Sequence, residues 1–129
     1  MEVRKKMKGW NLRLWYKGHN ILFNDYERAI IDIMLEDPLK AWGSGKMHEA
    51  VKAKGIDISR ASVIFYLNFL VNEGIAGFED TTGKGGHHKL YSIPRTEDDV
   101  NKMIMTRIVK GLAEALDVDL DWITERWLS

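Results

Sequence analysis

Hydrophobic side chains recur at intervals of three and four residues through much of the chain, a spacing that places them on one face of an α-helix. A first helix is expected after a cap at Asn24 or Asp25, a second from about 44 to 53, and a third between Ser59 and Gly74. Their apolar positions are Tyr26, Ala29, Ile30, Ile33, Met34, Met47, Ala50, Val51, Val63, Tyr66, Leu67, Leu70 and Val71.

Two segments of alternating polarity follow the third helix. Residues 75–80 and 89–93 are expected to form strands, joined by a polar, glycine-rich loop at 81–88 that projects into solvent. Thr96 is expected to cap a fourth helix, because three carboxylates follow it where they suit the helix dipole. The apolar side chains of this helix are Val100, Met103, Ile104, Ile108, Leu112 and Ala115.

The two ends of the chain differ from its middle. Residues 10–23 alternate loosely around a turn at 17–20, which indicates a hairpin arm, and a last short helix is expected from Asp119 or Asp121. We therefore divide the chain into a basic and aromatic arm at 1–23, a central domain at 24–95 and a helical C-terminal segment at 96–129.

Composition narrows the protein class. A chain of 129 residues with 45% hydrophobic content suits a single folded unit. The absence of cysteine excludes disulfides, thiolate metal sites and a thiol nucleophile. No apolar run approaches the roughly 20 residues that cross a bilayer, and no export signal is apparent, so we expect a cytoplasmic protein without membrane contact.

The net charge is zero, but the charges are segregated along the chain. Residues 1–20 contain six basic side chains and one acidic one, whereas residues 96–129 contain four basic and eight acidic ones. Attraction to phosphate is therefore expected only near the basic arm and any basic loop, and a net charge of zero does not exclude a nucleic-acid partner.

The order of helix, short extended link (at about 42–45), two helices and hairpin is that of a winged helix-turn-helix, a mainly helical α+β fold. The stretch from Ile58 to Ile75 resembles the recognition helix of winged-helix repressors, and the segment from Thr82 to Tyr91 resembles their wing. The likeness is to the penicillinase-repressor type and its archaeal relatives and, more loosely, to the multiple-antibiotic-resistance regulators. It implies a repressor that binds double-stranded DNA as a homodimer.

In this interpretation the third helix enters the major groove of DNA. Arg60 is expected to pair with guanine and Asn68 with adenine, and Ile64 or Phe65 is expected to contact a thymine methyl group. Alternatively, Ile64 and Phe65 are packed under the N-terminal arm. The candidate contacts are Ser59, Arg60, Ala61, Ser62, Ile64, Phe65 and Asn68.

The expected wing contacts are positively charged or glycine residues that allow a close approach to phosphates or the minor groove. An ordinary mobile loop is the alternative. Adjacent histidines on a strand point to opposite faces, so His87 and His88 are not expected to share a metal ion. The wing candidates are Lys84, Gly85, Gly86, His87, His88 and Lys89.

The basic run near the N-terminus is a weaker candidate. It is either a flexible arm that follows the DNA backbone or a solvated chain start. The aromatic side chains of the arm, Trp10, Trp15 and Tyr16, are expected to pack rather than to stack on bases. The basic residues are Arg4, Lys5, Lys6 and Lys8.

The fourth helix and the chain end carry more apolar side chains than a small hairpin can cover, so we expect a two-fold dimer interface there. The alternative is that the fourth helix covers the first helix of its own chain. The expected interface residues are Val100, Met103, Ile104, Ile108, Leu112, Trp122 and Trp127.

The sequence leaves one alternative to a regulator open and disfavours another. A winged helix used for protein–protein contact in a larger transcription or processing assembly would use Ile64 and Phe65 as its docking patch. Enzymatic activity is not expected, because no framed serine, histidine pair at helical spacing or phosphate loop is present. No residue pattern indicates a cofactor, a metal ion or a small-molecule effector.

Overall fold

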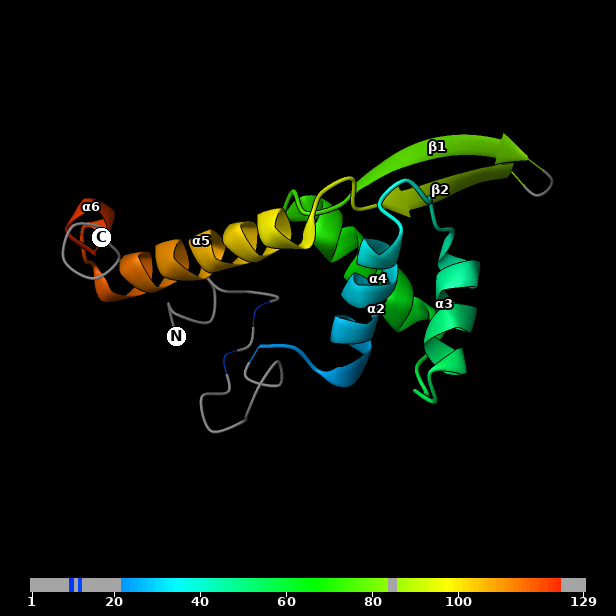
Figure 1. Cartoon of the computed structure of the whole chain (residues 1–129), viewed down its shortest axis with the longest axis horizontal. Helices are drawn as coiled ribbons and strands as arrows, with labels where there is room; N and C mark the ends of the chain where they lie inside the picture. Colours follow the sequence, from blue (N-terminus) through cyan, green and yellow to red (C-terminus); the bar gives the residue numbers. More distant parts are fainter. Residues whose placement is uncertain (1–9, 11, 13–21, 84–85, 124–129) are drawn as a thin grey trace.

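The computed structural model describes Trp10, Leu12 and residues 22–83 and 86–123. The predicted N-terminal hairpin lies almost entirely outside these residues. The described elements form a mainly helical α+β winged helix with a two-stranded antiparallel sheet, as predicted (Figure 1). They are α2 (Asp25–Glu36), α3 (Ser44–Ala53), α4 (Arg60–Asn72), β1 (Gly77–Gly83), β2 (Gly86–Ser92), α5 (Glu97–Leu116) and α6 (Leu120–Ile123).

Local capping chemistry sets the helix ends close to where the sequence predicts them. Asn24 caps α2 through a capping box, in which its side-chain oxygen accepts from the Glu27 amide at 3.0 Å and the Glu27 carboxylate accepts from the Asn24 amide at 2.9 Å. Ser59 and Thr96 cap α4 and α5, because their side-chain oxygens accept from the backbone amides of Ser62 and Asp99. Gly74 follows α4 with a φ of +77°, a left-handed conformation that glycine adopts without a steric cost.

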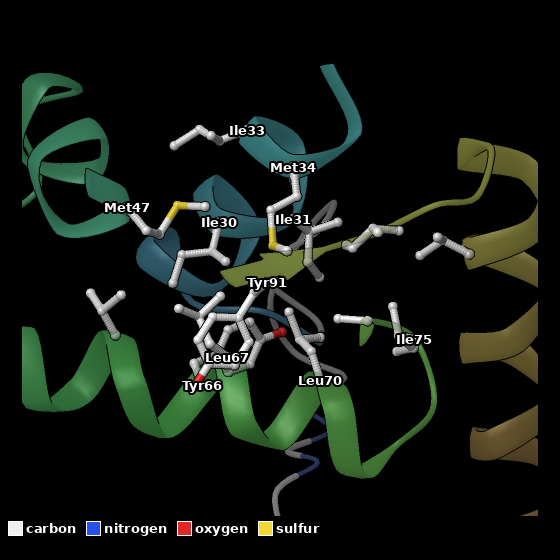
Figure 2. Packing of buried hydrophobic residues seen from close by; sticks show 14 of the residues in the cluster. Ile30, Ile31, Ile33, Met34, Met47, Tyr66, Leu67, Leu70, Ile75 and Tyr91 are labelled. Atoms are coloured by element: carbon white, nitrogen blue, oxygen red, sulfur yellow. The ribbon is translucent and has the colours of Figure 1, made fainter. Parts of the chain in front are cut away.

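The core lies between α2, α3, α4 and the base of the hairpin (Figure 2). Of the apolar positions predicted for these helices, all but Tyr26, Ala50 and Val71 are buried, and those three are partly buried. Full burial of a large aliphatic side chain stabilises the fold by about 1.5 to 3 kcal/mol before entropy costs are subtracted. Side chains that are fully buried are Ile30, Ile31, Met34, Met47, Val51, Val63, Leu67, Leu70, Ile75, Ile93 and Val100.

The hairpin is longer than its sequence suggests. Its register runs from the Gly77–Ser92 pair to the Gly83–Gly86 pair, so most of the predicted loop at 81–88 is strand. The β-branched Thr81 and Thr82 favour strand, and a short connection between glycines suits a tight hairpin turn. Residues 84–85 lie outside the described part of the chain.

A short backbone bridge fastens the hairpin to the link between α2 and α3. The Trp42 amide donates to the Tyr91 carbonyl oxygen at 2.7 Å, and the Tyr91 amide donates to the Trp42 carbonyl oxygen at 2.8 Å. His48 of α3 donates through Nε2 to the Ile58 carbonyl oxygen at 2.7 Å and so holds the turn that leads into α4. These bonds hold the helices and the wing in one unit.

The helix α5 begins against the body of the winged helix and extends away from it on the side opposite the wing (Figure 1). Val100 and Ile104 are buried in the core of their own chain, and Glu97 lies 3.7 Å from Arg28 of α2. The expectation that Val100 and Ile104 belong to a dimer interface is therefore wrong, because their apolar surface is already covered. The alternative, in which this helix covers the first helix of its own chain, stays a prediction; the Arg28–Glu97 ion pair is a contact between the two helices.

The rest of the expected dimer surface differs in exposure along α5. Met103 and Ile108 are half-buried, whereas Leu112 and Trp122 are exposed. Trp127 lies outside the described residues. Among the helices that the structure describes, none is long and apolar enough to cross a membrane.

The contrast between two neighbouring residues of α5 provides a test of this packing. Ile104 is 6% exposed and Met105 is 60% exposed. Ile104→Ala should lower the free energy of unfolding by about 2 to 5 kcal/mol, because it leaves a cavity. Met105→Ala should change it by less than about 0.5 kcal/mol. Urea denaturation of both variants measures the difference, and equal effects would show that α5 does not pack on the core.

Candidate nucleic-acid interface

The start of α4 is held by its own serines. The Ser59 hydroxyl oxygen accepts from the Ser62 amide at 3.1 Å, and the Ser59 hydroxyl donates to the Ser62 hydroxyl oxygen at 3.0 Å. Ser59 and Ala61 are exposed, and Ser62 is half-buried. These short side chains leave the first turn of α4 open to a close approach by a large ligand.

Arg60 is turned toward α3. Its Nη2 donates to the Ser44 hydroxyl oxygen at 3.2 Å, at the first residue of that helix. A Cβ on Gly45 would lie 3.6 Å from this guanidinium, an ordinary van der Waals distance, so Gly45 lies directly beside the arginine. Arg60 is the single charged residue of α4, and the structure thus directs its charge toward the flank of the helix.

A cavity of about 350 Å³ joins three elements beside this arginine. Among the described residues, no side chain caps α3, whose N-cap is Gly43. The positive end of the helix dipole and two cationic side chains, Arg60 and Lys89, therefore line one hollow, a combination that suits phosphate oxygens. The lining residues are Gly43, Ser44, Arg60, His88, Lys89, Leu90 and Tyr91.

The outer face of α4 is apolar at its centre. Phe65 is 72% exposed, and Ile64 beside it is half-buried. Trp10, a described residue of the arm, packs one turn further along α4, with its ring 5.4 Å from that of Phe69 and its Nε1 donating to Glu73. Trp10 is buried, in agreement with the packing role expected for it.

Asn68 is held by the base of the wing. The Tyr91 hydroxyl donates to Asn68 Oδ1 at 2.8 Å. Burial, with a smaller contribution from the Asp80 carboxylate, raises the pKa of Tyr91, so its hydroxyl retains the proton that it donates. The expected pairing of Asn68 with adenine requires both its oxygen and its nitrogen, and the oxygen is already engaged. The amide nitrogen is the group that remains for an external acceptor.

Lys89 and His88 of β2 differ in their surroundings. Lys89 places its Nζ 4.7 Å from the centroid of the Phe78 ring, and the register sets Asp80 directly opposite Lys89. Because directly opposed residues share a face of a hairpin, both lie on the face from which Tyr91 reaches α4. His88 is exposed and stands opposite Thr81.

Several expected contacts cannot be placed. The wing residues Lys84 and Gly85 lie outside the described part of the chain, and so do the arm residues Arg4, Lys5, Lys6 and Lys8. Gly86 and His87 are described only by their backbone in β2. Within the described ranges, no three histidine, aspartate or glutamate side chains gather as a metal site would require.

Sequence reasoning missed the contribution of α3 to this interface. The sequence predicts a helix from about 44 to 53 but gives no functional role to its start, and it predicts Tyr91 as a strand residue without such a role. The order of elements contains the missing signal, because in a helix-turn-helix the helix before the recognition helix crosses the DNA backbone. The role of Asp80 follows only from the strand register, which the sequence did not predict.

No family model matches the sequence, and no curated protein matches it. Among solved structures, the chain is similar to a "possible transcriptional regulator" from Methanosarcina mazei Go1, with a TM-score of 0.56. The two chains are 13% identical, and the match covers 81% of this chain and 80% of the other. At this identity the likeness is one of fold, over most of both chains.

Proposed function

We propose that this protein is a transcriptional regulator that binds double-stranded DNA in a sequence-specific manner, a repressor that acts as a homodimer in the cytoplasm. The observation that supports this most is the cationic cavity beside α4, where Arg60, Lys89 and the start of α3 converge. The similar solved protein is described as a possible regulator, and the sequence resembles winged-helix repressors.

In this proposal α4 lies in the major groove with Ala61 and Phe65 toward the bases. The diameter of a helix, about 10 to 12 Å with side chains, fits a groove about 12 Å wide. A phosphate of one strand would occupy the cavity between Arg60 and the start of α3, and Lys89 would contact the backbone from the wing. Phosphate contacts would orient the helix, and its outer face would read the sequence.

The acidic side chains of the wing limit how strongly the wing can bind DNA. β1 contains Glu79 and Asp80, and β2 contains a single lysine, Lys89, so the described part of the hairpin has no net positive charge. Asp80 shares the face of Lys89, whereas Glu79 is paired with Leu90 on the opposite face. The Asp80 carboxylate would therefore oppose phosphate binding on the side where the wing approaches DNA.

The proposed dimer uses the C-terminal half of α5. Leu112 and Leu116 are exposed, and Val109 before them is half-buried. Their spacing of three and four residues is the heptad spacing that pairs two helices along a seam. Trp122 of α6 is also exposed and would extend this surface.

A second candidate function is protein–protein contact within a larger transcription or processing assembly. It is favoured by Phe65, since a large exposed aromatic side chain is typical of interface hot spots. The DNA experiments below separate the two functions.

The first test is selection of bound duplexes from a random pool, followed by a salt titration of the selected site. We expect a palindromic consensus and a steep loss of affinity with salt, with a slope of about −0.9 in log K per phosphate contacted. Arg60→Ala should weaken binding by about 1 to 3 kcal/mol.

Lys102→Ala is the matched control for Arg60→Ala, because Lys102 is an exposed cation on α5 that pairs with Asp98 at 3.1 Å. It should leave the affinity unchanged. Absence of duplex binding at every salt concentration would reject the regulator and leave the protein-contact function.

The strand register generates a second prediction. Asp80→Asn should tighten duplex binding by up to about fivefold at low salt, since two charges about 4 Å apart in water interact by about 1 kcal/mol. Glu79→Gln removes the same charge from the opposite face and should have a smaller effect. Fluorescence anisotropy with both variants measures the ratio, and a larger effect of Glu79→Gln would contradict the proposed orientation of the wing.

The dimer surface gives a third prediction. Leu112→Glu should shift the protein toward monomer in sedimentation equilibrium, because it places a charge in the proposed seam. Thr106→Glu adds the same charge at an exposed polar position of α5 and should leave the association unchanged. Equal sedimentation of the two variants would exclude α5 as the seam.

A further inference from the structure

Phe65 is the most exposed aromatic side chain among the described residues. Phe78 and Trp122 expose 42% and 43% of their surfaces, whereas Phe65 leaves 72% of its surface in solvent at the middle of α4. An exposed aromatic ring at this position does not stabilise the core. Its surface is available to whatever α4 contacts.

Beside this ring, Asn68 has one of its two polar groups engaged. Its Oδ1 accepts from the Tyr91 hydroxyl, whereas Arg60 donates to Ser44 on the flank of the helix. The Asn68 amide nitrogen, a donor, is therefore the group of this side chain that can serve an external acceptor. Phe65 and Asn68 are three residues apart on α4, a spacing that puts their side chains next to each other on the helix surface.

The major-groove edges of the four bases differ in a way that this pair can distinguish. Thymine presents a C5-methyl group and, on the neighbouring ring carbon, the O4 acceptor, whereas cytosine presents a donor at that place and adenine a donor beside an acceptor. An apolar ring next to a donor is complementary to the methyl group and O4 of thymine. The engaged Oδ1 of Asn68 disfavours the adenine contact that sequence reasoning expected.

We propose that Phe65 and Asn68 together recognise thymine in the major groove, with Phe65 on its C5-methyl group and Asn68 donating to its O4. Tyr91 is a positioning residue in this proposal, because its hydroxyl holds the Asn68 amide in the donor orientation. The inference rests on the proposed function and specifies which base the recognition helix selects.

The first experiment removes only the methyl group. In the duplex selected from the random pool, each thymine is replaced in turn by uracil, which keeps every hydrogen-bonding group of the base. At one or more positions of each half-site we expect wild-type affinity to fall about fourfold, the value of one buried methyl-sized group. In Phe65→Ala this thymine-to-uracil ratio should fall to about one, and in Phe65→Leu it should persist.

Phe78→Ala is the matched control, because Phe78 is the other exposed phenylalanine and lies on the wing. It should retain the thymine-to-uracil ratio of the wild type. Equal affinities of the wild type for thymine and uracil duplexes would overturn the proposal and leave DNA binding standing. So would a Phe65→Ala variant that keeps the wild-type ratio, a result that would assign Phe65 to a protein partner.

The second experiment tests the donor orientation. Replacing the same thymine–adenine pair by 5-methylcytosine–guanine keeps the methyl group and exchanges the O4 acceptor for a donor. Wild-type affinity should fall by about tenfold or more. Tyr91→Phe frees Asn68 to rotate, so this penalty should shrink while the thymine-to-uracil ratio remains. An unchanged penalty in Tyr91→Phe would overturn the positioning role of Tyr91.

Discussion

The arrangement of the whole winged helix depends on how the base of its hairpin is fastened to the helices. Tyr91 makes this attachment with its backbone and its side chain at once. The backbone pairs with Trp42 in the link before α3, and the hydroxyl bonds to Asn68 on α4. Two strands alone are marginal in water, so these bonds and the burial of Tyr91 keep the hairpin in a defined place. The face of the wing that turns toward α4 is thereby set as well.

A net charge of zero is compatible with a polyanionic partner because the described charges are separated in space. Arg60 and Lys89 line the cavity beside α4, whereas Asp32, Glu36 and Glu97 gather around Lys54 in a different cavity of about 380 Å³. Charges beyond about 10 Å are largely screened at moderate salt. The local sign of the charge beside α4 therefore matters more than the total.

Sequence patterns predicted the elements that local chemistry determines. The N-terminal ends of α2, α4 and α5 follow from the N-caps Asn24, Ser59 and Thr96, because a cap acts within one turn of its own residue. Periodicity could not say what would cover each apolar face, so Val100 and Ile104 were assigned to a partner when their own chain buries them. Nor could it show that Arg60 and Asn68 find partners in Ser44 and Tyr91, which lie 16 and 23 residues away. The sequence therefore could not indicate which polar atoms of Arg60 and Asn68 remain for an external partner.

A further contact connects α4 to the proposed dimer interface on α5. Glu73, the C-cap of α4, accepts from Arg107 Nε of α5 at 3.1 Å and from the Trp10 side chain. Together with the burial of Val100 and Ile104, this ion pair sets the direction of α5 relative to α4. In the proposed dimer, two α4 helices must lie about 34 to 36 Å apart to reach successive major grooves. A dimer interface on the C-terminal half of α5 would fix this separation only if α5 is held rigidly against its own chain. Glu73 contributes to this rigidity, because it joins the end of α4 to Arg107 of α5.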